Sequence, residues 1–270
     1  MITLTSDFGT PYPAAMKGVI LKQCDARLVD VGHDFPRQGV RATAFWLTET
    51  LPEFPPAVHI VVVDPGVGTD RAALVIRAGD HVLVGPDNGV LLPPARALAS
   101  GGDQHARDID AYELVVEDPR SATFHGRDIF APAAAAVHEA GIDRLPELEV
   151  VSPAHDVVDL EFPEADVRGD GATGEVLAVD GFGNVITNVP GDALDDHDEV
   201  HVDGDPEPTP VVTSYAHADP GDPIATVGSH GNVELAVNRG RGDETFDLAV
   251  GDAVELVYAA AFEFEFASDE

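Results

Sequence analysis

The sequence predicts an α/β amino-terminal domain, with a mostly parallel sheet between helices, followed by an all-β carboxy-terminal barrel. In the first half of the chain, short apolar strands alternate with helix-like segments. After about residue 163 only short strands occur, and Gly, Pro and Asp separate them. The change falls at linker-like residues between 161 and 171. We therefore expect two domains, residues 1–163 and 164–270.

The elements of the amino-terminal domain follow from the period of the apolar residues. Short apolar runs bounded by turn residues predict strands at 2–5, 27–31, 58–63, 72–77 and 81–84. Longer segments predict helices at 12–23, 39–51 and 132–140. The last two strands are expected to form a hairpin around Gly79 and Asp80. This β-α-β order is typical of a parallel sheet with helices on its faces.

The carboxy-terminal domain shows no helical period. Its apolar runs predict strands at 173–179, 185–188, 199–202, 211–213, 224–227, 233–237 and 253–264. Many short strands separated by turn residues are typical of a small barrel or sandwich.

The charge of the chain describes its surroundings rather than its chemistry. There are 49 acidic and 15 basic residues, a formal charge of −34, spread along the chain. In molar salt the Debye length falls to about 3 Å, so repulsion among these charges is largely screened. We therefore expect a halophilic protein of a salt-rich cytoplasm. Nucleic acid is not an expected partner, because there is no basic stripe for phosphate contacts.

Neither a membrane nor an oxidising compartment is indicated. No apolar run approaches the roughly 20 residues of a membrane helix, and MITLTSDFG enters a strand directly, unlike a signal peptide. The single cysteine, Cys24, excludes an internal disulfide and fits a reducing cytoplasm. It lies in a helix-like segment and is expected to be buried and inert. The histidines show no metal-binding spacing, so no metal site is expected.

Polar residues and glycines gather in loop motifs beside the predicted elements. These motifs are TSDFGT (5–10), DPGVGTDR (64–71), GPDNG (85–89) and TFHGRD (123–128). Open α/β sheets bind ligands at the carboxyl ends of their strands, so three of these loops are expected to meet at one sheet edge. His125 then has two interpretations, structural or functional. GPDNG is explained equally well as a simple turn.

Asp64 ends a buried strand, and Arg71 lies one short loop away, where its guanidinium can turn back on the carboxylate. Such a pair is either a structural clasp or half of a catalytic site, and both interpretations stay open. Gly66 and Gly68 do not form a dinucleotide fingerprint, because a strand is predicted at 72–77 where that motif needs a helix.

The barrel domain carries two further polar motifs, DGFGNVITN (180–188) and SHGNVELAVNRG (229–240). In the first, the ring of Phe182 can stack on a planar base while the amide of Asn184 reads the edge of that base. The alternative is a β-hairpin with a polar turn, and the sequence does not separate the two.

Together, the motifs resemble those of the S-adenosyl-L-methionine (SAM) hydroxide adenosyltransferase family, the SAM hydrolases related to the fluorinase and chlorinase enzymes. The resemblance runs nearly end to end through TSDFGT, MKGVI, VVDPGVGTDR, GPDNG, TFHGRD, DGFGN and SHGNVELAVN. It implies hydrolysis of SAM to adenosine and L-methionine, with SAM as substrate and no cofactor. It also implies a homotrimer whose active sites lie between neighbouring subunits.

The resemblance places a water-activating triad on Asp64, Arg71 and His125. In the halogenating relatives a Ser stands at the position of Gly126, so the pair His125-Gly126 favours water over halide as nucleophile. A SAM-dependent halogenase and a non-catalytic SAM or adenosine-binding protein are the two alternatives.

The same resemblance implies a set of substrate-binding residues drawn from both domains. Asp7 corresponds to the acid that holds the ribose diol. The implied contacts of the methionine amine and carboxylate are Asp180 and Ser229. The implied contacts of adenine are Phe182 and Asn184, with Tyr215 as a second stacking surface.

Overall fold

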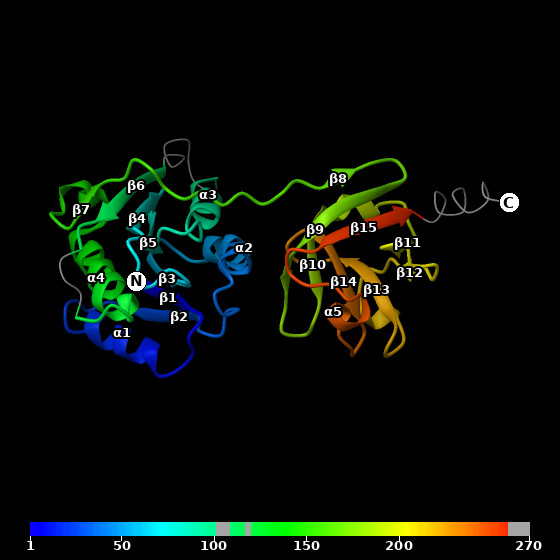
Figure 1. The fold of residues 1–270 in the computed structure, drawn as a ribbon, viewed down its shortest axis with the longest axis horizontal. Helices are drawn as coiled ribbons and strands as arrows, with labels where there is room; N and C mark the ends of the chain where they lie inside the picture. Colours follow the sequence, from blue (N-terminus) through cyan, green and yellow to red (C-terminus); the bar gives the residue numbers. More distant parts are fainter. Residues whose placement is uncertain (101–108, 117–119, 259–270) are drawn as a thin grey trace. The chain divides into compact units, whose positions relative to one another are not determined.

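The computed structural model describes residues 1–100, 109–116 and 120–258. The chain divides into two compact units, Met1–Glu161 and Phe162–Glu270, and each has its own buried apolar core. The first is a mixed α/β unit and the second an antiparallel, nearly closed β-barrel (Figure 1). The predicted fold class is therefore confirmed.

A seven-stranded sheet forms the centre of the first unit, in the order β2-β1-β3-β5-β4-β6-β7. The strands are β1 (Ile2–Ser6), β2 (Leu28–Gly32), β3 (Val58–Val62), β4 (Ala73–Ala78), β5 (His81–Pro86), β6 (Ile109–Leu114) and β7 (Val151–Pro153). The pairs β1/β2, β1/β3 and β3/β5 are parallel, whereas β4/β5, β4/β6 and β6/β7 are antiparallel. The parallel half of the sheet, centred on β1 and β3, is the half that leads into the polar loops.

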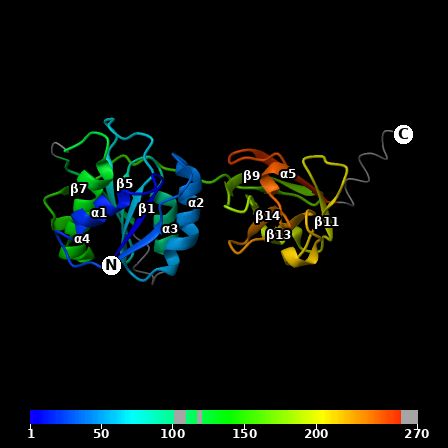
Figure 2. The same cartoon turned by 90° about the horizontal axis from the view of Figure 1, so that it is seen from below.

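Helices cover both faces of this sheet. The helices are α1 (Tyr12–Ile20), α2 (Val40–Thr50), α3 (Leu92–Ser100) and α4 (Ala131–Ala140), with short helical turns η1 (Leu51–Glu53), η2 (Gly126–Phe130) and η3 (Ile142–Glu147). α1 packs with α4 on one face, and α2 packs with α3 on the other (Figures 1 and 2). Within the described ranges, no helix has the length and apolar character needed to cross a bilayer.

The first helix is shorter than the sequence predicts. It ends at Ile20 rather than at residue 23, because the amides of Lys22 and Gln23 bond three residues back instead of four. Cys24 therefore lies beyond the helix, although it is buried as expected.

The second unit is built from strands that pair in the order β12-β11-β15-β9-β10-β14-β13, with β8 beside β9. The elements are β8 (Asp166–Val167), β9 (Gly171–Val179), β10 (Val185–Pro190), η4 (Gly191–Leu194), β11 (Glu199–Val202), β12 (Thr209–Pro210), η5 (Tyr215–His217), β13 (Pro223–Val227), β14 (Asn232–Val237), α5 (Gly242–Thr245) and β15 (Ala253–Tyr258). All the ladders are antiparallel, and an isolated bridge between Val211 and Ala225 brings the two edges together.

Two predicted strands of this unit need comment. The segment 211–213 is not a strand: it contributes only the bridge at Val211, after the short strand β12 ends at Pro210. Proline has no amide hydrogen to donate, which limits continuation of a ladder at that point. The predicted strand at 253–264 is observed over Ala253–Tyr258, and its remainder lies outside the described residues.

Candidate active site

The carboxyl ends of β1 and β3 place two acids side by side. The two strands pair in parallel, with Ser6 opposite Val62. Asp7 follows β1 directly, and Asp64 follows β3 after one further residue. This edge is where a parallel sheet presents its ligand-binding loops.

Asp64, Arg71 and His125 are in direct contact. Nε of Arg71 donates to Oδ1 of Asp64 at 2.8 Å, and Nη2 donates to Oδ2 of the same carboxylate. Nη2 also lies 3.0 Å from Nδ1 of His125. The Asp64 and Arg71 side chains are only 5% and 10% exposed, so this bidentate pair is shielded from solvent. The remaining nitrogen, Nη1, donates to the carbonyl of Ala72.

The contact with Arg71 fixes the tautomer of His125. A guanidinium has only donors, so Nδ1 of His125 must be the acceptor and the ring proton must lie on Nε2. Burial, with the positive charge of Arg71, lowers the pKa of His125 from its ordinary value of 6.5, and Asp64 and Asp128 act in the opposite direction. His125 is therefore neutral at pH 7 and presents an N–H rather than a lone pair.

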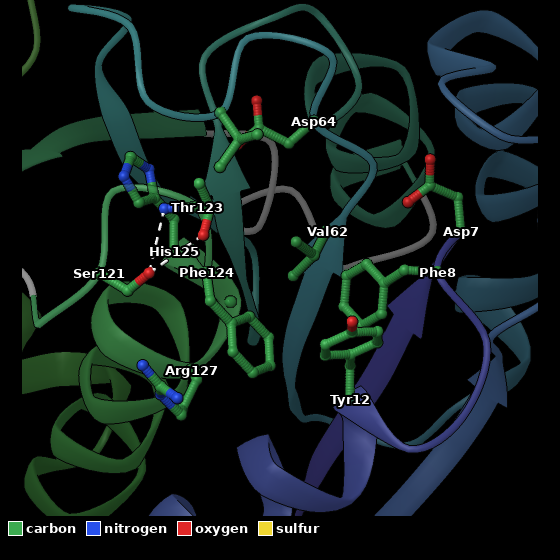
Figure 3. A pocket seen from close by; sticks show the side chains of 12 residues that line it. Asp7, Phe8, Tyr12, Val62, Asp64, Ser121, Thr123, Phe124, His125 and Arg127 are labelled. Atoms are coloured by element: carbon green, nitrogen blue, oxygen red, sulfur yellow. Dashed lines mark hydrogen bonds between the residues drawn. The ribbon is translucent and has the colours of Figure 1, made fainter.

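Beside these residues lies a pocket of about 480 Å³, a volume suited to an organic ligand. It is lined by residues from the loops 5–10, 64–71 and 121–127. Figure 3 shows Asp7 and His125 on opposite sides of the pocket, with Asp64 between them. The expected convergence of three polar loops at one sheet edge is thus observed, and the fourth loop, GPDNG, does not line the pocket.

An aromatic cluster forms one wall of the pocket. The rings of Phe8, Tyr12 and Phe124 meet edge to face, with centroids 5.4–6.2 Å apart (Figure 3). The guanidinium of Arg127 stacks 4.9 Å from the centroid of Phe124 and pairs with Asp128. The wall offers apolar surface against which a flat or aliphatic part of a ligand can pack.

Two contacts to backbone carbonyls, one by the backbone of Gly68 and one by the side-chain amide of Asn88, hold the loop around Asp64 in place. Gly68 has φ +81°, and a Cβ there would lie 2.9 Å from the carbonyl of Ala122, so only glycine allows this approach to the loop before His125. From the other side, the amide of Asn88 donates to the carbonyl of Val63 at 2.8 Å. In GPDNG, Gly85 and Pro86 end β5 and residues 87–90 form a bend, whose Asn88 side chain positions the residue next to Asp64.

His125 stands at the start of a single π-helical turn, η2, that leads into α4. Such turns inside helices recur at functional sites because they change the direction of side chains locally. The next residue, Gly126, is buried, and a Cβ there would lie 3.0 Å from Sδ of Met16. A larger residue at position 126 must therefore displace Met16.

Of the residues expected to contact substrate in the barrel unit, Asp180, Phe182, Asn184 and Tyr215 are linked by hydrogen bonds around one hairpin turn. Oδ1 of Asp180 accepts from the amides of Phe182 and Asn184, and Oδ2 accepts from Nδ2 of Asn184 at 3.0 Å. Nδ2 of Asn184 also lies 3.4 Å from the hydroxyl of Tyr215. The ring of Phe182 is 79% exposed at the tip of the turn, and Ser229 is exposed between β13 and β14.

Sequence reasoning missed several residues of these two clusters. Tyr12 and Ser121 line the pocket of the first unit, and Glu234 joins the barrel cluster. Tyr12 lies two residues after the end of the TSDFGT motif and begins a helix, which is a usable signal. Glu234 gives none, since a lone Glu in a strand is normally taken to face solvent. Over the described part of the chain, no three His, Cys, Asp or Glu side chains are arranged to hold a metal ion.

The fold and the pocket define a small-molecule enzyme site at the carboxyl edge of an α/β sheet, with a shielded carboxylate, guanidinium and imidazole beside the cavity. Comparisons with known proteins narrow this class. The SAM hydroxide adenosyltransferase N-terminal domain model matches residues 2–148, and the C-terminal domain model matches residues 174–255. The chain belongs to the SAM hydroxide adenosyltransferase family.

Curated relatives and solved structures agree with this membership. A protein of Salinispora tropica named (R)-S-adenosyl-L-methionine hydrolase is 40% identical, over 94% of this chain and 97% of its own length. One of the same name from Thermus thermophilus is 38% identical, over 93% and 97%. The crystal structure of an uncharacterized conserved protein from Thermotoga maritima, 32% identical, covers 95% of this chain and 100% of its own with a TM-score of 0.79.

Proposed function

We propose that this chain hydrolyses SAM to adenosine and methionine by attack of water on C5′ of the ribose. The contact of Arg71 with both Asp64 and His125, beside a pocket of ligand size, is the observation that carries the proposal. The family membership and the names of the curated relatives support the same reaction.

The reaction balances without a cofactor. The oxygen of water forms a bond to C5′, the C5′–S bond breaks, and its electron pair neutralises the sulfonium to give the thioether of methionine. The water loses one proton. Because the sulfonium is already a good leaving group, the protein must chiefly orient the water and favour its hydroxide-like form, and positioning alone can supply about 7–11 kcal/mol.

We propose a different role for each of the three side chains, on the basis of their contacts. Arg71 only donates, and its charge favours an anionic nucleophile. His125 presents Nε2–H, so it orients the water as a donor, because an accepting role would need the lone pair that Arg71 already occupies. Of the three side chains, Asp64 is then the one that can still accept a hydrogen bond from the water. We therefore propose that its carboxylate takes the proton that the water loses.

The remaining substrate contacts are proposed from the family resemblance. Asp7 lines the pocket and is assigned to the ribose diol. Its Oδ2 already accepts from the amide of Gln38 at 2.7 Å, which fixes the carboxylate in place. The assigned methionine contacts are Asp180 and Ser229. The assigned adenine contacts are Phe182, Asn184 and Tyr215.

We also propose that the chain forms a homotrimer with active sites between subunits. The family resemblance supports this, and Phe182, which is 79% exposed, is available for a ligand or a partner subunit to cover. Light scattering on the full chain tests the stoichiometry. A cytoplasmic location and dependence on high salt remain predictions from composition.

The activity is tested by chromatography of the products after incubation with each sulfonium epimer of SAM in molar KCl. Adenosine release by the wild type is the expected result. Formation of 5′-chloro-5′-deoxyadenosine instead would identify a halogenase, and binding without turnover would identify a sensor.

Variants then test the triad. Asp64→Asn and His125→Ala should lower kcat at least about 100-fold, because they remove groups that touch the water, while KM stays within about tenfold. Asp70→Asn is the matched control, since Asp70 lies exposed on the same loop. Full activity in either triad variant would refute the assignment.

A further inference from the structure

A chain of hydrogen bonds in the barrel unit ends at a buried acid. Oε1 of Glu234, on β14, accepts from the hydroxyl of Tyr215, and the oxygen of Tyr215 faces Nδ2 of Asn184 at 3.4 Å. Glu234 is 6% exposed, and the residues beside it on β14 are buried and apolar. A carboxylate in such a place costs stability unless it is paired, so its presence calls for an explanation.

The acid fixes the direction of every hydrogen bond in the chain. An ionised carboxylate only accepts, so Tyr215 must give its single hydroxyl hydrogen to Glu234. The oxygen of Tyr215 can then only accept, and it accepts from Asn184. Burial and the hydrogen bond to Glu234 both raise the pKa of Tyr215, so the phenol keeps its proton at any working pH.

This direction and the carboxylate of Asp180 together determine which way the amide of Asn184 faces. Both hydrogens of Nδ2 are used, one by Asp180 and one by Tyr215. Among the residues that the structure describes, none donates to Oδ1 of Asn184. The group that Asn184 offers to a ligand is therefore a hydrogen-bond acceptor.

We propose that Glu234 is a positioning residue for base specificity: through Tyr215, and together with Asp180, it holds the amide of Asn184 with its oxygen available, which selects a purine carrying an exocyclic amino group over the 6-oxo purine. This inference rests on the proposed function, which places the adenosyl group at Asn184. An amino group donates to Oδ1, whereas a 6-oxo group would face it oxygen to oxygen. In a buried site, a ligand that leaves a polar group of the protein without its hydrogen bond binds much more weakly than one that makes the bond.

The surroundings of Glu234 hold the carboxylate from the other side. Nε2 of His230 lies 3.5 Å from Oε2 of Glu234. A Cβ on Gly228 would lie 2.9 Å from the same oxygen and would also collide with the imidazole of His230, so glycine is required there. The carboxylate is thus held between Tyr215 and a hairpin that leaves it little freedom.

The test compares adenosine with inosine as ligands of the full chain by titration calorimetry. The wild type should prefer adenosine at least about tenfold, equivalent to about 1.4 kcal/mol. Glu234→Gln should lower this preference at least about threefold, because a Gln amide can donate to Tyr215, whose oxygen is then no longer reserved for Asn184, and Asp180 alone holds the Asn184 amide. Glu199→Gln, which neutralises an exposed acid of the same unit, should keep the wild-type ratio.

Kinetics provide a second measurement. With SAM and its 6-oxo analogue S-inosylmethionine as substrates, Glu234→Gln should narrow the ratio of their KM values, whereas Glu199→Gln should leave both that ratio and kcat for SAM unchanged. A merely structural role would lower stability and affinity for both ligands alike without changing the ratio.

Each outcome decides the inference. Equal affinity of the wild type for adenosine and inosine, or an unchanged ratio in a folded Glu234→Gln variant, overturns it. If that variant does not fold, Tyr215→Phe replaces it: this change keeps the ring but breaks the link, and only a reduced ratio supports the inference. If the wild type fails to hydrolyse SAM, the proposed function fails, yet the calorimetric ratio still tests Glu234.

Discussion

One nitrogen of Arg71, Nη2, contacts both a carboxylate oxygen of Asp64 and Nδ1 of His125. The three side chains therefore share one arrangement of protons: the guanidinium charged, the carboxylate accepting, and the imidazole neutral with its hydrogen on Nε2. Any change that adds a proton to His125 brings two donors together and breaks the contact.

Activity should accordingly be lost on the acidic side. The pKa of His125 is lowered from 6.5, so the ring stays neutral as the pH falls from 7.5 to 6.5 and becomes protonated only below that value. We expect kcat/KM for SAM to stay level over that interval and to decline at lower pH. A pH–rate profile at constant ionic strength checks this, and a rate that rises below pH 6.5 would contradict the neutral imidazole.

The amide of Asn88 should matter for turnover although it does not line the pocket. Its Nδ2 donates to the carbonyl of Val63, next to Asp64, and its Oδ1 accepts from the amide of Val90. Asn88→Asp keeps the acceptor and removes the donor. We expect about tenfold lower kcat with little change in KM, since the carboxylate loses its positioning, and about 1 kcal/mol less stability.

The matched control for Asn88 is its neighbour Asp87. Oδ1 of Asp87 only accepts, from the amide of Val158 at 2.8 Å, and Asp87→Asn preserves that acceptor. Steady-state kinetics and urea unfolding of both variants separate the two effects. An Asn88→Asp variant with wild-type kcat would show that the hydrogen bond from Asn88 to Val63 has no part in positioning Asp64.

Replacing Gly126 by Ser should destabilise the protein without creating a halogenase. The new Cβ would lie 3.0 Å from Sδ of Met16, so the core must shift, at a cost of about 1–3 kcal/mol. Urea unfolding measures the loss, and Gly126→Ala, which adds the Cβ alone, controls for the hydroxyl. Chlorinated nucleoside formed by the Ser variant in molar chloride would contradict the expectation.

Salt should stabilise this protein more than an uncharged solute does. With a formal charge of −34, repulsion weakens as the Debye length shrinks from about 10 Å at 0.1 M to about 3 Å at 1 M. We expect Tm to rise by at least about 5 °C over that range, equivalent to roughly 1–2 kcal/mol. Calorimetry in KCl and in isosmotic sucrose checks this. If Tm rises equally in the two solutes, charge screening is not the cause of the stabilisation.

The sequence predicts well which polar loops meet at the carboxyl edge of the sheet, because the strands that precede these loops are marked by buried residues. The run at 58–63 is apolar apart from His59, which is typical of a central parallel strand, and the segment at 2–5 alternates Ile and Leu with Thr. Once such strands pair, the loops that follow them must meet, so the approach of Asp7 and Asp64 could be predicted without coordinates. The contact of His125 with Arg71 depends on the approach of Gly68 to Ala122, which no local pattern reveals.

Other elements were hidden by their composition. The helix α3 begins Leu92-Pro93-Pro94, and prolines there read as breakers although they are compatible with a first helical turn. The strand β6 is half exposed and carries two acids, so its apolar signal is weak. The residues of β14 from 233 to 237 are all buried, so the alternation that normally marks an outward-facing Glu is absent, and the inward position of Glu234 could not be read.

The parallel pairing of β1 with β3 determines how the pocket is lost when the protein unfolds. Asp7 and Asp64 leave from strands whose register is fixed by fully buried side chains, because a slip of one residue in β1 would put Thr3 and Thr5 in the places of Ile2 and Leu4. The spacing of these two acids is therefore protected by the global free energy of folding, like the slowest-exchanging amides of a domain. On warming, enzyme activity and the pairing of β1 with β3 should therefore be lost at the same temperature, without a folded but inactive intermediate.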